Sequence, residues 1–327
     1  MAIPLHMAKE QHTKVWQNWH GRHTFCCDGR CMVGPDFSVT AFAWIVLTST
    51  CVCFWVYVSP NIPSVVTAMG AALYASTLLC LILTATTDPG IIPRNTVMDE
   101  AEAAANAAMQ KTVDVNGQTV PLKWCKTCHI WRPPRASHCS ECNVCVDRFD
   151  HHCPWMGQCI GRRNYRYFIG FIVSLSALCL YTALVSLIVL IWKSKYETSV
   201  LIIDRFLNAF EHFPSTGVLL VFPSFVLLCI GPLGCYHACL LSRNLTTNED
   251  IKGTYGEHSP FRGNCLQNCH ESLCESLEPS RIYPRSYDVE QLGTSMLFRG
   301  DALSDAVCAG DAEVVDVESQ AIPAVNE

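Results

Sequence analysis

The chain has 327 residues, of which 50% are hydrophobic and 16% are charged, and its mean hydropathy is +0.20. Soluble globular proteins carry about 25% charged residues, so the composition favours a membrane protein over a soluble one. The net charge of −6 comes mostly from an acidic C-terminal tail while the central region is basic, so the overall charge defines no single partner.

Cysteine is frequent, with 21 residues. Such a number is typical of disulfides in small secreted domains. No early signal peptide is expected, because the first long apolar run begins near Val39. Cys-x-x-Cys pairs among Arg and Lys instead indicate metal sites in a reducing compartment.

Residues 1–38 form a polar, His-rich segment before the first apolar run. Cys26, Cys27 and Cys31 lie near the expected membrane surface, where cysteines are candidate S-acylation sites. Free thiols without a role are the alternative.

Four apolar segments follow, each about 20 residues or longer and nearly free of charge. At ~1.5 Å rise per residue such a segment spans a hydrocarbon core of ~30 Å, whereas a buried core helix would be shorter and have a polar face. The chain is therefore predicted to be an all-α integral membrane protein with two pairs of transmembrane helices, within 39–84 and 167–241. The segments are 39–58, 64–84, 167–192 and 217–241.

Lys and Arg concentrate in cytosolic loops, which gives an expected orientation. The loop at 85–166, between the second and third segments, has ten of them. The loop at 59–63 has none, and the loop at 193–216 has three, mixed with acidic residues. The 85–166 loop is therefore predicted to be cytosolic, and four spans then place the 1–38 segment and the C-terminus there too.

The chain after the fourth segment is predicted to have two parts. Residues 242–285 begin with a polar run, and their apolar and Cys-rich stretch at 259–280 is typical of an interfacial element. From 286 to 327, few aromatic residues and an acidic balance predict a disordered tail.

A stretch rich in Cys and His, at 125–159, forms the centre of the cytosolic loop, whose core is expected at 123–165. It holds seven cysteines and four histidines. Two tetrahedral zinc ions take eight ligands, so two filled sites leave three of these side chains free. A free thiol beside an imidazole is the expected site of chemistry. Spacing alone leaves the grouping open, and one alternative is a sequential site of Cys125, Cys128, Cys139 and Cys142.

The sequence Asp-His-His-Cys at 150–153 resembles the DHHC protein S-acyltransferases, or palmitoyltransferases. The family spacing Cys-x2-Cys-x9-His-Cys-x2-Cys-x2-Cys-x4-Asp-His-His-Cys-x5-Cys is met at every position of 125–159. The family's Asp-Pro-Gly motif matches 88–90, and its Thr-Thr-x-Glu motif matches 246–249. The resemblance covers roughly 37–280.

A fourth family motif, an aromatic and Asn element after the last span, is met loosely by Phe261 and Asn268. The resemblance also implies that Thr247 approaches Asp150. Glu249 and Asp88 are expected to hold structure rather than to take part in chemistry.

The resemblance further implies two structural zinc sites with interleaved ligands. With all eight ligands from protein, neither metal has an open position for water. His129, His151 and Cys153 remain, and His129 is expected at the surface. One ligand set is Cys125, Cys128, His138 and Cys145, and the other is Cys139, Cys142, His152 and Cys159.

Cys153 is the predicted nucleophile. A Cys thiol has an unperturbed pKa of ~8.5 and attacks only as the thiolate. His151 can take its proton, and Asp150 can orient the imidazole and stabilise the imidazolium. In the expected reaction, Cys153 takes a long-chain acyl group, palmitoyl, from acyl-CoA and passes it to a cysteine of a substrate protein.

The acyl chain is expected in a cavity among the four spans, where the resemblance places Trp155. A Trp there is also expected simply as an interfacial anchor. The CoA phosphates need cations, although each candidate could instead serve only membrane topology. The candidates are Arg132, Arg135, Arg162, Arg163 and Arg166.

Other functions fit less well. An inactive zinc scaffold needs no spare thiol beside an Asp-His pair, and a zinc transporter would need ligands inside the spans, where only His237 lies. A zinc hydrolase needs an open coordination position, and flanking spans do not fit a nucleic-acid-binding finger. The expected partners are palmitoyl-CoA, substrate proteins at the cytosolic face and the membrane of the Golgi, the ER or the cell surface, with no nucleic acid.

Overall fold

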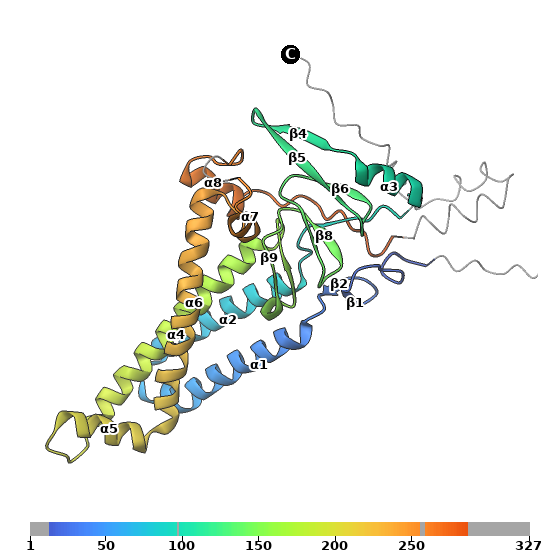
Figure 1. The fold of residues 1–327 in the computed structure, drawn as a ribbon. Helices are drawn as coiled ribbons and strands as arrows, with labels where there is room; N and C mark the ends of the chain where they lie inside the picture. Colours follow the sequence, from blue (N-terminus) through green and yellow to red (C-terminus); the bar gives the residue numbers. More distant parts are fainter. Residues whose placement is uncertain (1–12, 97, 256–258, 287–327) are drawn as a thin grey trace, which may run out of the picture. The chain divides into compact units, whose positions relative to one another are not determined.

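Four long apolar helices dominate the computed structural model (Figure 1). Each has the length and composition needed to cross a membrane, and large apolar side chains such as Val173 and Ile188 are exposed on them, as lipid-facing surfaces require. The prediction of four membrane-spanning segments is confirmed at this level. The spans are Phe37–Asn61, Ser64–Thr86 (α2), Tyr165–Ser194 (α4) and Pro214–Arg243 (α6), and the first begins with α1 (Phe37–Cys53).

The structure describes residues 13–96, 98–255 and 259–286. By their contacts, residues 14–286 form one unit. The tail predicted to be disordered, at 286–327, lies outside the described residues from position 287 onward.

Helix α4 packs against both α2 and α6. The approach to α2 is close, because a Cβ at Gly70 would lie 2.8 Å from the ring of Tyr181 on α4. The Tyr181 hydroxyl donates a hydrogen bond to the Val66 carbonyl, which ties the two helices together. These two neighbours make α4 the most buried of the four helices.

The segment between α2 and α4 corrects the all-α expectation. Apart from helix α3 (Glu100–Ala108) and a 3-10 helix at Pro154–Met156, its regular structure consists of antiparallel strands. Each Cys-x-x-Cys pair forms the turn of a hairpin. The residues on the two sides of that turn therefore hydrogen-bond to each other as strands and do not continue into a helix. The strands are β3 (Ile91–Ile92), β4 (Lys111–Val115), β5 (Gln118–Cys125), β6 (Ile130–Arg132), β7 (Ser137–Cys139), β8 (Val144–Val146), β9 (His151–Cys153) and β10 (Gln158–Ile160).

Three arrangements of these strands position the site. Strands β3, β8 and β7 form one sheet in that order, β4, β5 and β6 form a second, and β9 pairs with β10 as a hairpin. Gln158 at the start of β10 donates from Nε2 to the carbonyls of Thr84 and Thr87, at 2.9 and 3.0 Å. The β9–β10 hairpin is therefore fixed to the end of α2.

Smaller elements complete the described chain. A hairpin of β1 (Thr24–Cys26) and β2 (Cys31–Val33) precedes α1, and α5 (Ile202–His212) joins α4 to α6. Helices α7 (Thr247–Lys252) and α8 (Cys265–Leu273) follow α6. Helix α8 lies in the stretch predicted to be interfacial and packs against α6.

Candidate active site and metal centres

The first Cys/His cluster joins the β5–β6 and β7–β8 hairpins. Cys125 and Cys128 come from the first hairpin and His138 and Cys145 from the second, and their ligand atoms lie within 4.8 Å of one another. Nδ1 of His138 is 3.4 Å from Sγ of Cys128 and 3.8 Å from Sγ of Cys145. The Cys128 N–H donates to Sγ of Cys125 at 3.4 Å, which favours that sulfur as a thiolate.

The second cluster joins the β7–β8 and β9–β10 hairpins. Cys139, Cys142, His152 and Cys159 bring their ligand atoms within 4.8 Å of one another. Nδ1 of His152 lies 3.6, 3.4 and 3.7 Å from the three sulfurs. The structure thus groups the ligands in the interleaved sets, not in the sequential alternative.

These distances fit a tetrahedral zinc ion. Zn–S bonds of ~2.3 Å and Zn–N bonds of ~2.0 Å place neighbouring ligand atoms about 3.5–3.8 Å apart. The spacings within both clusters match that range, and a Cys3His donor set is typical of structural zinc. Both clusters are therefore suited to hold zinc.

Asp150 and His151 form a buried pair beside the second cluster. Nδ1 of His151 lies 2.6 Å from Oδ2 of Asp150, which is only 2% exposed. Thr247 donates to the same carboxylate from its hydroxyl at 2.8 Å and from its backbone N–H at 2.9 Å. The start of α7 therefore meets the Asp-His-His-Cys segment, as the resemblance implies.

The pKa values of this pair move in the directions that stabilise an ion pair. Burial raises the pKa of Asp150, but hydrogen bonds from His151 and Thr247 outweigh it and leave the pKa below its usual range. Burial lowers the pKa of His151, yet hydrogen bonds to Asp150 and Cys153 raise it to about 9. His151 therefore holds a proton between the Asp150 carboxylate and the Cys153 sulfur.

Cys153 is buried where the Cys-rich region meets the membrane helices. Its backbone is extended, at φ −119° and ψ 105°, as expected before Pro154. Its neighbours are apolar side chains of α2, α4 and the β9–β10 hairpin, among them Leu81, Phe168 and Phe171. Trp155, two residues on, is 56% exposed.

The arginine candidates lie in different environments. The side chain of Arg162 is 38% exposed and lies 3.0 Å from Glu278. Arg163 lies 3.3 Å from Asp88, and Arg132 donates from Nε to the Lys123 carbonyl at 3.4 Å.

Arg135 is held in a buried ion pair, an arrangement that favours a structural role. Its Nε and Nη2 each lie 2.8 Å from a carboxylate oxygen of Glu249. Both side chains are buried, at 6% and 3% exposed. The guanidinium also contacts Asn244 and lies 4.7 Å from the ring centre of Phe261.

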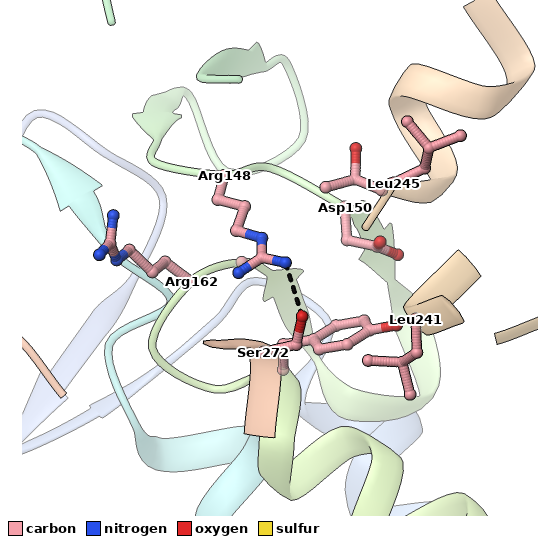
Figure 2. Close-up of a pocket in the computed structure, with 9 residues that line it drawn as sticks. Arg148, Asp150, Arg162, Leu241, Leu245 and Ser272 are labelled. Carbon is pink, nitrogen blue, oxygen red and sulfur yellow. Dashed lines mark hydrogen bonds between the residues drawn. The ribbon is translucent and has the colours of Figure 1, made fainter. Parts of the chain in front are cut away.

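A small pocket opens behind Asp150 (Figure 2). Figure 2 shows Arg148 reaching across it to donate to Ser272 Oγ, at 2.7 Å. Burial lowers the pKa of Arg148 to about 10. Leu241, near the end of α6, and Leu245, just after the helix, line the same pocket.

Several residues around the site were not assigned to it from the sequence. Asn244 ends α6 in a left-handed conformation and accepts from Arg148 at 2.7 Å. His237 lies with its ring centre 6.1 Å from that of His151. Asp36 contacts His152 at 2.7 Å. Only His237 carried a sequence signal, as an ionisable residue inside a span.

Four helices able to cross a membrane and two Cys3His clusters beside an Asp-His-Cys array define a multi-pass membrane protein with a Cys-rich metal-binding region. A family model described as DHHC palmitoyltransferase matches residues 118–254.

Similar proteins extend the match over most of the chain. Palmitoyltransferase ZDHHC9 of Bos taurus is 35% identical over 91% of this chain and 90% of its own length. The Homo sapiens protein of that name is 37% identical over 84% of this chain and 80% of its own. Palmitoyltransferase ZDHHC18 of Mus musculus is 37% identical over 84% and 76%. The chain therefore belongs to the DHHC palmitoyltransferase family, and its enzyme class is protein S-palmitoyltransferase.

Proposed function

We propose that this protein moves a palmitoyl group from palmitoyl-CoA to cysteines of substrate proteins through a thioester on Cys153. The observation that carries the proposal is the position of one thiol. Of the seven cysteines at 125–159, Cys153 lies outside both metal clusters, contacts His151 and packs against apolar side chains of the membrane helices.

In the first step the Cys153 thiolate attacks the thioester carbonyl, and the bond from that carbon to the CoA sulfur breaks. The departing CoA thiolate takes the proton held by His151. In the second step His151 accepts the proton of the substrate thiol, whose sulfur attacks the acyl carbon and releases Cys153 as a thiolate. Asp150 stabilises the imidazolium before the first step and after the second, and it orients the neutral ring between them. One thioester replaces another, so positioning rather than driving force is the main requirement.

The two ends of palmitoyl-CoA need different surroundings. The apolar side chains around Cys153 support an acyl site among α2, α4 and the β9–β10 hairpin, and the exposed indole of Trp155 is proposed to contact the chain. We propose Arg132, Arg162 and Arg163 as partners of the CoA phosphates.

We propose that each Cys3His cluster binds one structural zinc ion. Zinc in such a site contributes folding energy directly and supplies no open coordination position. Cys139 and Cys142, His152 and Cys159 would then fix the β9–β10 hairpin, which keeps Cys153 next to His151.

We further propose that the regions at 1–38, 85–166 (core 123–165) and 242–285 lie in the cytosol, with the spans within 39–84 and 167–241. The substrates are then proteins at the cytosolic face of a Golgi, ER or plasma membrane. The ten basic residues of the 85–166 loop support this orientation.

Incubation of the purified protein with palmitoyl-CoA tests the function. We expect a hydroxylamine-labile acyl group on the peptide that contains Cys153, and transfer to an added substrate protein. Cys153→Ser should lose both while it keeps two zinc ions. Cys139→Ser should instead lose zinc and stability. Cys229→Ser, an exposed site on α6, is the matched control and should behave as wild type.

An unlabelled Cys153 in folded, zinc-loaded protein would support an inactive scaffold. Loss of a zinc ion from Cys153→Ser would mean that the ligands are wrongly assigned.

A further inference from the structure

Asp36 connects the first membrane helix to the second metal cluster. Oδ2 of Asp36 lies 2.7 Å from Nε2 of His152, while Nδ1 of the same ring lies among the sulfurs of Cys139, Cys142 and Cys159. Asp36 is the residue just before α1, where an Asp side chain ordinarily caps its own helix. Here it makes no such capping bond, and the carboxylate contacts the imidazole instead.

The backbone around Asp36 is packed onto the turn that joins His152 to Cys159. The Asp36 N–H donates to the Gly157 carbonyl at 3.2 Å. A Cβ at Gly34 would lie 2.1 Å from that carbonyl oxygen, and one at Gly157 would lie 2.7 Å from Oγ1 of Thr40. Glycine at both positions is what allows this approach, so the carboxylate is held at the imidazole by its own backbone.

We infer that Asp36 is a positioning residue for the second zinc site, an inference that rests on the proposed zinc binding. A histidine that binds a metal through one nitrogen commonly donates the N–H of the other to a carboxylate. That bond fixes the proton on Nε2, leaves the Nδ1 lone pair for the metal and sets the plane of the ring. Asp36 provides this acceptor for His152.

The two metal clusters differ in this respect. Among the described residues, the histidines that pair with a carboxylate are His151, His152 and His212. His138, the histidine of the first cluster, is not one of them. Removal of the Asp36 carboxylate should therefore weaken one zinc site and leave the other unchanged.

The experiment uses the full chain in detergent with zinc itself as the probe. Asp36→Asn is nearly isosteric and keeps an acceptor oxygen without the charge, and Asp36→Ala removes both. Asp28→Asn is the matched control, because Asp28 lies in the same N-terminal region and contacts Lys14 at 2.9 Å. Zinc release to a chelator is timed, and ¹¹³Cd-substituted samples are compared by NMR.

We expect two zinc ions per chain in every variant before the chelator is added. Asp36→Ala should release one of them about ten-fold or more faster, since loss of such a carboxylate typically weakens metal binding 10–100-fold. Asp36→Asn should show a smaller increase. One of two ¹¹³Cd resonances should shift in both Asp36 variants, and neither should shift in Asp28→Asn.

Three results would overturn the inference. Equal release from both sites, or loss of folding in Asp36→Asn, would show that Asp36 only stabilises the start of α1. Unchanged release in Asp36→Ala would show that the contact has no effect on the metal. Fewer than two zinc ions in the wild type would instead contradict the proposed zinc binding itself.

Discussion

The order of residues in the Asp-His-His-Cys segment follows from strand geometry. His151, His152 and Cys153 form β9, and successive side chains of a strand point to opposite faces. His151 and Cys153 therefore share one face, where they contact each other, while His152 points to the sulfurs on the other face. Two adjacent histidines can thus serve a metal and a nucleophile without competition.

Thr247 offers a test at the scale of one hydroxyl. A hydrogen bond to a charged group contributes about 1.5–3 kcal/mol, equivalent to ten-fold or more in rate if it is needed to stabilise the imidazolium. We expect Thr247→Val to slow acylation of Cys153 by about that factor, because Asp150 would lose the hydroxyl and keep only the Thr247 backbone N–H and His151 as partners.

Single-turnover acylation by palmitoyl-CoA measures this rate, and Thr247→Ser should restore most of it. A normal rate in Thr247→Val would show that the hydroxyl does not support Asp150.

At the scale of elements, a buried ion pair joins the Cys-rich loop to the end of α6. Arg135 precedes β7 and pairs with Glu249 in α7. Arg135 also donates to the side chain of Asn244 at the end of α6, and Glu249 accepts from the Thr246 N–H just after it. Loss of one member of a buried pair leaves an uncompensated charge and costs about 3–5 kcal/mol. We expect Arg135→Ala to lower the free energy of unfolding by that amount, measured by denaturation in detergent.

A pair at the surface provides the comparison. Arg243 and Asp250 lie 3.0 Å apart with side chains 45% and 26% exposed. Exposed pairs contribute about 0–1 kcal/mol, so Arg243→Ala should change stability by no more than that. Equal losses in the two variants would contradict the role given to Arg135.

The membrane helices could be predicted from the sequence because each is a long apolar run, a local signal. Strands β7 to β10 could not, since runs of three residues carry no periodicity and their hairpins depend on the metal ligands that they hold. The ligand types followed from spacing, but their grouping came only with the family resemblance. The contact of Asp36 with His152 joins residues 116 positions apart, and no local pattern reports such a distance.

At the scale of the whole molecule, the orientation in the membrane can be tested with inserted epitopes. Gly117 lies at an open hairpin tip, with no atom within 4 Å of a Cβ built there, and Val200, in the loop after α4, is 89% exposed. We expect a tag after Gly117 to be reached by antibody once the plasma membrane alone is permeabilised. If the protein lies in an internal membrane, a tag after Val200 should stay out of reach of the antibody under the same conditions. If the protein lies at the cell surface, that tag should be stained on intact cells.

Tags that respond alike would contradict the proposed arrangement. The controls are untagged protein and a tag at the N-terminus, which should respond as the Gly117 tag does.

The β7–β8 hairpin supplies ligands to both metal clusters, with His138 and Cys145 on one and Cys139 and Cys142 on the other. Both centres therefore depend on the same strand pair, so disorder of this one hairpin would disable both, even though each ion can leave its own site at its own rate. On the proposed zinc binding, a chain made while zinc is scarce would have its four membrane helices but not the ordered β7–β8 hairpin. In such cells, metal supply would set how many copies of the protein can lipidate their targets.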